Sequence, residues 1–146
     1  MTRTARSSRN TAIFVAIALL TGCASVSNFW HTTSVKLEGA QEVPPVTTSA
    51  KGEGEFTVAD RSISGQVTVS GMTPTAAHIH MGEAGKSGTV IVPLAKTAAN
   101  TFSVPAGVKL TDAQFEAYKK NNLYVNVHSK AHPNGELRGQ IKPPMF

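Results

Sequence analysis

The chain has 146 residues, which is enough for one domain of ordinary size and too few to favour two. Hydrophobic residues make up 40% and charged residues 16% of the sequence, a balance that excludes a disordered chain and a coiled coil. A single cysteine excludes an internal disulfide and a cysteine-rich zinc cluster, and the net charge of +5 is unevenly distributed.

The first 22 residues have the pattern of a secretory signal peptide. Three arginines precede an apolar run over residues 11–20, which is too short to span a bilayer as a helix. The sequence Leu20-Thr21-Gly22-Cys23 follows and resembles a bacterial lipobox, in which cleavage after Gly22 leaves Cys23 as an acylated first residue. We therefore expect a lipoprotein signal peptide over residues 1–22, then a lipidated Cys23 and a flexible tether that together span 23–33.

Cleavage at this site changes the charge and predicts a location. The mature chain would keep 11 basic and 9 acidic residues, a net charge of +2 (11 − 9), so a nucleic-acid partner is not expected. Acyl chains on Cys23 would attach the protein to a membrane without a transmembrane helix. Ala24 follows, and the lack of Asp at that position resembles lipoproteins of the outer membrane that face the periplasm of Gram-negative bacteria.

Residues 34–146 show the pattern of a β-rich domain. Apolar residues alternate with polar ones between turn residues, and this period of two predicts about eight short strands. The predicted strands lie at residues 35–37, 56–58, 63–69, 76–81, 89–94, 102–104, 123–128 and 136–141. The run over 89–94 is apolar and β-branched, which indicates a strand buried on both faces.

One segment has the pattern of a short helix. Thr111 and Gln114 fit a capping box at its start, and Leu110, Phe115 and Tyr118 would form its apolar face. Eight strands and one short helix predict an all-β fold, an antiparallel Greek-key β-sandwich.

Three of the predicted strands carry polar rows on the face opposite their apolar residues. Residues i and i+2 of a strand point to the same side, so each row shares one face. The rows are His78 and His80, then Tyr124, Asn126 and His128, then Glu136, Arg138 and Gln140. They would form one polar patch if the three strands are neighbours in a sheet.

The histidines in these segments indicate a metal site. Neutral imidazole is a common ligand of Zn(II) and Cu(II), and a His-x-His pair on a strand directs both rings to one side. We predict His78, His80 and His128 as primary ligands and His132 as a fourth. Asn126 and Glu136 would orient the rings. The alternative is a metal-free network in which the same imidazoles form hydrogen bonds.

The segment GAQEVPPV over residues 39–46 predicts an extended loop, because two prolines cannot donate to a strand ladder. Glu42 in this loop is expected to have a structural role. Arg138 is expected to form a bidentate ion pair with Glu42 or Glu136.

Signatures of known enzyme classes are weak. The chain has no G-x-S-x-G elbow and no glycine loop placed to bind phosphate at the start of a helix. We therefore assign no catalytic residue, and the sequence favours a non-enzymatic role without deciding the question.

Four ordered motifs resemble the CHRD domain family. They are GAQEVPPV (39–46), AHIHMG (77–82), LYVNVHS (123–129) and HPNGELRGQI (132–141), and the resemblance spans residues 35–141. Ser129 stands where the family usually has Thr. The resemblance implies a β-sandwich with the general architecture of copper–zinc superoxide dismutase, and it implies no single shared activity.

These observations support one leading hypothesis and two alternatives. The leading hypothesis is a lipid-anchored envelope module that binds Cu(II) or Zn(II) through its histidines. The first alternative is a metal-free structural or protein-interaction domain with an unidentified protein partner. The second is a redox enzyme of dismutase type, although the chain lacks the cysteine pair typical of those enzymes.

Overall fold

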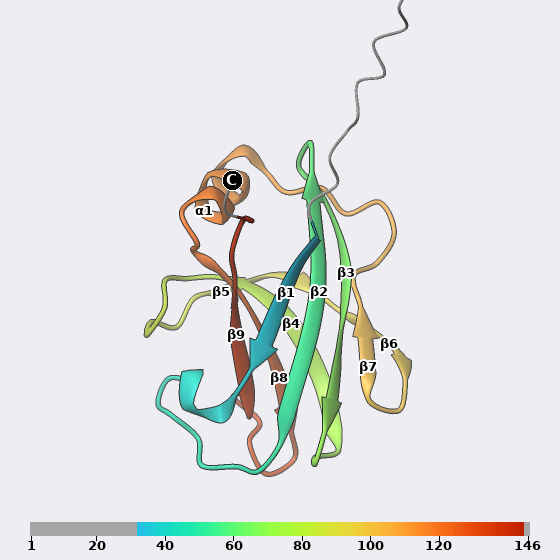
Figure 1. Ribbon diagram of the computed structural model, residues 1–146, viewed down its shortest axis with the longest axis vertical. Helices are drawn as coiled ribbons and strands as arrows, with labels where there is room; N and C mark the ends of the chain where they lie inside the picture. Colours follow the sequence, from blue (N-terminus) through green and yellow to red (C-terminus); the bar gives the residue numbers. More distant parts are fainter. Residues whose placement is uncertain (1–31, 145–146) are drawn as a thin grey trace, which may run out of the picture.

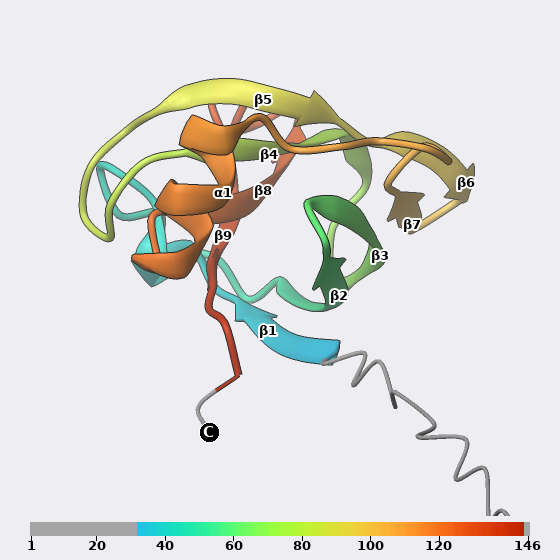
Figure 2. The same ribbon diagram turned by 90° about the horizontal axis from the view of Figure 1, so that it is seen from above.

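Two antiparallel β-sheets pack face to face in the computed structural model, which describes residues 32–144 (Figures 1 and 2). The first sheet has the order β1-β2-β3-β7-β6, formed by β1 (Thr32–Leu37), β2 (Lys51–Ala59), β3 (Ser62–Ser70), β7 (Thr101–Ser103) and β6 (Ala95–Ala98). The second has the order β5-β4-β8-β9, formed by β5 (Thr89–Pro93), β4 (Pro74–Met81), β8 (Leu123–Ser129) and β9 (Leu137–Ile141). A 3₁₀ turn, η1 (Gly39–Gln41), follows β1, and one helix, α1 (Asp112–Lys119), precedes β8. The predicted all-β sandwich with one short helix is confirmed.

The expected signal peptide and Cys23 lie outside the described residues. β1 begins at Thr32, two residues before the domain start expected at residue 34. Among residues 32–144, no helix has the length and apolar character needed to cross a membrane.

The core lies between the two sheets and follows strand alternation. In β1 Val35 and Leu37 are buried, and in β2 Gly52, Gly54 and Phe56 are buried, with exposed residues between them. Ile79 in β4 and Val125 and Val127 in β8 also lie in the core. Burying a large apolar side chain such as Leu37, Phe56 or Ile79 contributes about 1.5–3 kcal/mol. The apolar residues therefore fix which side of each strand faces inward, and they leave the polar rows of β4, β8 and β9 on the outer face of the second sheet.

Two strand predictions need correction. β5 was expected to be buried on both faces, but it lies at the edge of the second sheet and Val90 is 49% exposed. Val92 is buried in the core, and Ile91 packs against it while partly buried. β6 was not predicted, because all four of its residues are exposed and no apolar alternation marks it.

The two sheets also meet at one edge, where β1 approaches β9. Glu38 and Arg138 exchange backbone hydrogen bonds of 3.0 and 3.2 Å there. A Cβ on Gly139 would lie 2.5 Å from Val35 Cγ1 and 2.6 Å from the Lys36 oxygen, so this crossing requires glycine. The close contact fixes the position of Arg138 relative to both sheets.

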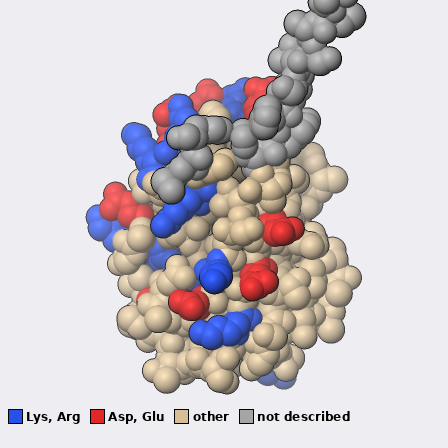
Figure 3. Space-filling view, in the orientation of Figure 1, with Lys and Arg blue, Asp and Glu red and all other residues tan. Residues whose placement is uncertain are grey.

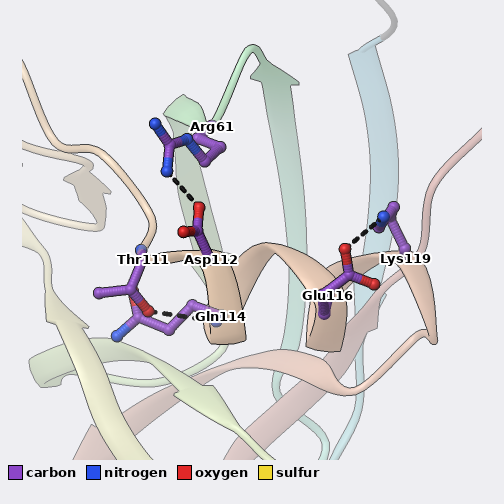
Figure 4. A network of polar contacts seen from close by, with 6 residues as sticks. All are labelled: Arg61, Thr111, Asp112, Gln114, Glu116 and Lys119. Carbon is purple, nitrogen blue, oxygen red and sulfur yellow. Dashed lines mark hydrogen bonds and ion pairs between the residues drawn. The ribbon is translucent and has the colours of Figure 1, made fainter.

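Helix α1 begins with the predicted capping box (Figure 4). The Thr111 hydroxyl accepts from the Gln114 N–H at 3.2 Å, and the Gln114 side chain accepts from the Thr111 N–H at 2.9 Å. An ion pair joins Arg61, in the turn between β2 and β3, to Asp112 in the first turn of the helix (Figure 4). These contacts fix the start of α1, whose Tyr118 is buried against the core.

The outer faces of the two sheets differ in chemistry. The outer face of β1 and β2 carries charges of both signs, including Lys36 opposite Glu53 and an ion pair of 3.6 Å between Lys51 and Glu38. Lys, Arg, Asp and Glu are correspondingly interspersed on the face shown in Figure 3. The outer face of the second sheet carries histidine and amide groups together with Tyr124 and the buried Arg138.

Candidate metal centre

Strands β4, β8 and β9 are neighbours, so their polar residues share one face, apart from Glu136, which precedes β9 and contacts Thr48 instead. The register pairs His78 with Asn126 and His80 with Tyr124 across β4 and β8. Asn126 in turn pairs with Arg138 on β9. Because paired residues in a sheet point to the same face, these side chains lie side by side.

Three histidines converge on this face. Each of His78, His80 and His128 offers one ring nitrogen, and the three nitrogens lie within 4.8 Å of one another. His78 Nδ1 is 3.0 Å from His128 Nε2. Two nitrogens bound to one zinc ion at tetrahedral angles lie about 3.3 Å apart, which follows from bond lengths of about 2.0–2.1 Å. The His78–His128 spacing is thus close to that of a metal site, and ring rotation would have to bring His80 nearer.

Backbone carbonyls fix the protonation of two of the rings. His80 Nδ1 lies 3.0 Å from the Gly88 oxygen, and His128 Nδ1 lies 2.9 Å from the Pro133 oxygen. A carbonyl can only accept a hydrogen bond, so in each neutral ring Nδ1 carries the proton and Nε2 keeps its lone pair. Metal-binding histidines typically donate their other ring N–H in this way.

The free nitrogen of His80 is buried. His80 is 8% exposed, and its Nε2 has no hydrogen-bond partner among the described residues. Leaving a buried polar atom unpaired costs about 1–3 kcal/mol. A metal ion bound at Nε2 would satisfy this atom.

The surroundings of His78 and His128 also favour the neutral form of their rings, which is the form that binds a metal ion. Burial lowers the pKa of His78 below its usual value, and the neighbouring His128 and His80 lower it further. Burial lowers the pKa of His128 as well, although its bond to the Pro133 carbonyl acts in the opposite direction. Protons therefore compete less for these nitrogens than they would for an exposed imidazole.

His132, predicted as a fourth ligand, is not part of the convergent group. It lowers the pKa of Glu136 instead, and it lines a cavity of about 270 Å³ together with Glu42 and the loop before β9. The prediction placed His132 near His128 because they are four residues apart. The turn after β8 separates the two rings, and His128 bonds to Pro133 within that turn. A metal ion on the three converging histidines would keep a fourth position for another ligand.

Glu136 and Asn126 do not orient the rings as predicted. Glu136 accepts a 2.7 Å hydrogen bond from the Thr48 hydroxyl. Burial acts to raise its pKa, but the Ser129 and Thr48 hydroxyls and the charge of His132 lower it overall. Asn126 is 3% exposed, and its Oδ1 has no hydrogen-bond partner within residues 32–144. The Gly88 and Pro133 carbonyls take the orienting role.

Glu42 is buried beside Asn126 and the loop before β9. Burial raises its pKa, and this outweighs the charge of Arg138, the Val43 N–H and the Asn126 amide, which all lower it. Gly135 has a φ of +127°, which favours glycine, and a Cβ there would lie 2.4 Å from Glu42 Oε1. Glu42 thus packs the 39–46 loop onto the patch, in keeping with a structural role.

Arg138 does not form the expected ion pair with Glu42 or Glu136. Its guanidinium donates to two backbone carbonyls in the loop after β4, those of Lys86 and Glu83, each at 2.8 Å. It also lies over the Tyr124 ring, with Cζ 3.5 Å from the ring centroid. Backbone oxygens thus replace the carboxylate partner that the sequence suggested.

Two loops border this face, and sequence reasoning gave neither of them a function. The 82–88 loop and the segment around η1 lie on the same side of the molecule (Figures 1 and 2) and together line a cavity of about 360 Å³. The Gly88 and Pro133 carbonyls had no signal in the sequence, because any residue has a carbonyl. The position of Tyr124 in the polar row does indicate from the sequence that it faces the site, but not what it contacts there.

The metal-free protein should lose stability as the pH falls below about 6.5. Unfolded imidazoles titrate near 6.5, whereas the pKa values of His78 and His128 are lower in the folded chain. Below 6.5 the unfolded state therefore binds more protons, and the free energy of unfolding falls as the pH drops through the lowered pKa values. Urea unfolding at a series of pH values measures this slope.

The matched control is His128→Gln, which removes one of the titrating rings. Its stability should depend less steeply on pH over the same range. Equal slopes in the variant and the wild type would contradict the lowered pKa of His128.

Comparison with known proteins places this sandwich in a family. The sequence profile of the CHRD domain matches residues 33–141, from β1 to the end of β9. Comparisons with curated proteins and with solved structures gave no significant match. The matched region covers well over half of the chain and contains all three converging histidines. The chain therefore belongs to the CHRD domain family.

Proposed function

We propose that this CHRD domain is a binding module of the cell envelope that holds Zn(II) or Cu(II) on His78, His80 and His128. The observation that carries the proposal is the set of three ring nitrogens within 4.8 Å. Nδ1–H of two of these rings donates to a backbone carbonyl oxygen, which leaves their Nε2 atoms free to bind.

The chemistry of the ligand set supports these two ions. Imidazole suits zinc and copper, whereas Mg²⁺ and Ca²⁺ require several oxygen ligands. The group that the structure brings together contains three imidazoles and no carboxylate. Three neutral ligands leave the full positive charge on the ion, so an anion or water would complete its coordination.

The metal-free alternative rests on a different observation. The 3.0 Å contact between His78 and His128 can be a hydrogen bond between two neutral rings, with His78 donating. That bond satisfies both nitrogens without an ion. It leaves His80 Nε2 without a partner in the described part of the chain, however, and this favours the metal site.

The anchoring part of the proposal rests on the sequence around Cys23. Eight residues, 24–31, separate this cysteine from the start of β1. Fully extended, they would span at most about 29 Å. The module would therefore bind its ion close to the membrane surface, on the periplasmic side of the outer membrane in a Gram-negative bacterium.

Zinc titration of the purified full-length chain in detergent tests the metal site. The wild type should bind one Zn(II) per chain, and His78→Ala should weaken binding by at least about 100-fold because a direct ligand is lost. Cu(II) should show the same pattern. Isothermal calorimetry gives the stoichiometry and the affinity.

The matched control is His132→Ala, which removes a nearby histidine outside the converging group and should leave zinc affinity unchanged. Wild-type protein that takes up neither ion would overturn the metal site and favour the metal-free network. Equal losses in His78→Ala and His132→Ala would overturn the assignment of ligands.

Fatty-acid labelling in a bacterial host tests the anchor. Wild-type protein should incorporate a labelled acyl chain and sediment with membranes, because an acylated Cys23 partitions into lipid. Cys23→Ser should lose the label and appear in the soluble fraction. Unlabelled, soluble wild-type protein would contradict lipidation without affecting the metal proposal.

A further inference from the structure

Tyr124 lies between Arg138 and His80 on the outer face of the second sheet. Its ring stacks on His80 with centroids 4.7 Å apart and planes 10° apart. The Arg138 guanidinium lies over the same ring, with Cζ 3.5 Å from the centroid. Because β8 lies between β4 and β9, the three side chains form one continuous stack across three strands.

Arg138 also holds the loop that follows β4. Its Nη1 donates to the Lys86 oxygen and its Nη2 to the Glu83 oxygen, both at 2.8 Å. Gln140 adds a 2.8 Å bond from Nε2 to the Gly82 oxygen. The Arg138 side chain is 2% exposed, so these buried bonds are shielded from competing water.

This loop ends at Gly88, the residue that bonds to His80. The Gly88 oxygen lies 3.0 Å from His80 Nδ1, and the Gly88 N–H donates to the Tyr124 hydroxyl at 3.1 Å. A Cβ on Gly88 would lie 1.9 Å from the Met81 oxygen, so this position requires glycine. Gly88 is thus held on one side by Tyr124 and on the other by His80.

We propose that Arg138 is a positioning residue for the metal centre, acting on His80 through Tyr124 and the 82–88 loop. It keeps the Gly88 carbonyl on His80 Nδ1, so that Nδ1 carries the proton and Nε2 stays free to bind the ion. The inference rests on the proposed function for its role in metal binding. The effect on the His80 tautomer can be tested without metal.

Arginine suits this role better than lysine. A guanidinium has several N–H donors in a planar fork, so it can bond to two carbonyls while stacking on an aromatic ring. A lysine ammonium is a point charge that does not stack in this way. The distinction gives the experiment a conservative variant.

The experiment compares Arg138→Met and Arg138→Lys with Arg61→Met in the full-length chain. Arg61 pairs with Asp112 beside α1 and serves as the matched control. Ring ¹⁵N shifts of His80 report its tautomer in the metal-free protein, and calorimetry gives the zinc affinity. Arg138→Met should mix the two tautomers and weaken zinc binding about 10–100-fold, the range seen when a group that orients a ligand is removed. Arg138→Lys should keep part of the single His80 tautomer and part of the zinc affinity. Arg61→Met should change neither the tautomer nor the affinity.

A double-mutant cycle with His80→Ala separates positioning from general stability. If Arg138 acts through His80, adding Arg138→Met to His80→Ala should leave zinc affinity within about twofold. If Arg138→Met weakens zinc binding equally with and without His80, the proposal is overturned. An unchanged His80 tautomer in Arg138→Met would also overturn it.

A second variant covers the case in which Arg138→Met does not fold. Tyr124→Phe removes only the hydroxyl that holds Gly88, and it should also mix the tautomers of His80. A single tautomer in Tyr124→Phe would overturn the proposal. If the wild type binds no zinc, the proposed function fails, and the tautomer measurements alone decide this inference.

Discussion

The antiparallel pairing of β4 with β8 determines which side chains can meet on the outer face of the second sheet. In this register His80 lies opposite Tyr124 and His78 opposite Asn126, so His128 is diagonal to His78. A shift of one residue would turn one strand's polar row toward the core. Buried apolar residues between the polar ones, such as Ile79 and Val127, prevent that shift. The packing of the core therefore places the histidines.

This dependence explains why much of the site could be predicted from the sequence. Alternation in Ala77-His78-Ile79-His80 identified both the buried and the outward residues, and the same pattern placed His128 on the matching face. The capping box at Thr111 was equally visible because capping is a local interaction. Properties set within a few residues of the chain were predicted correctly.

Properties set by contacts distant in sequence were not predictable. His132 was grouped with His128 because they are near in sequence, but the turn between them separates their rings. Arg138 was given a carboxylate partner, whereas it binds carbonyls more than 50 residues earlier in the chain. β5 was apolar enough to suggest burial, yet its place at the sheet edge exposes Val90. In each case the deciding partner is a loop or strand whose position no local pattern encodes.

X-ray absorption spectroscopy at the zinc edge of the zinc-loaded protein tests most directly whether the three imidazoles share one ion. We predict three nitrogen neighbours at about 2.0–2.1 Å with the outer-shell scattering of imidazole rings, plus one light atom from an external ligand. A first shell made of oxygen atoms, or one containing a single imidazole, would contradict a centre formed by His78, His80 and His128.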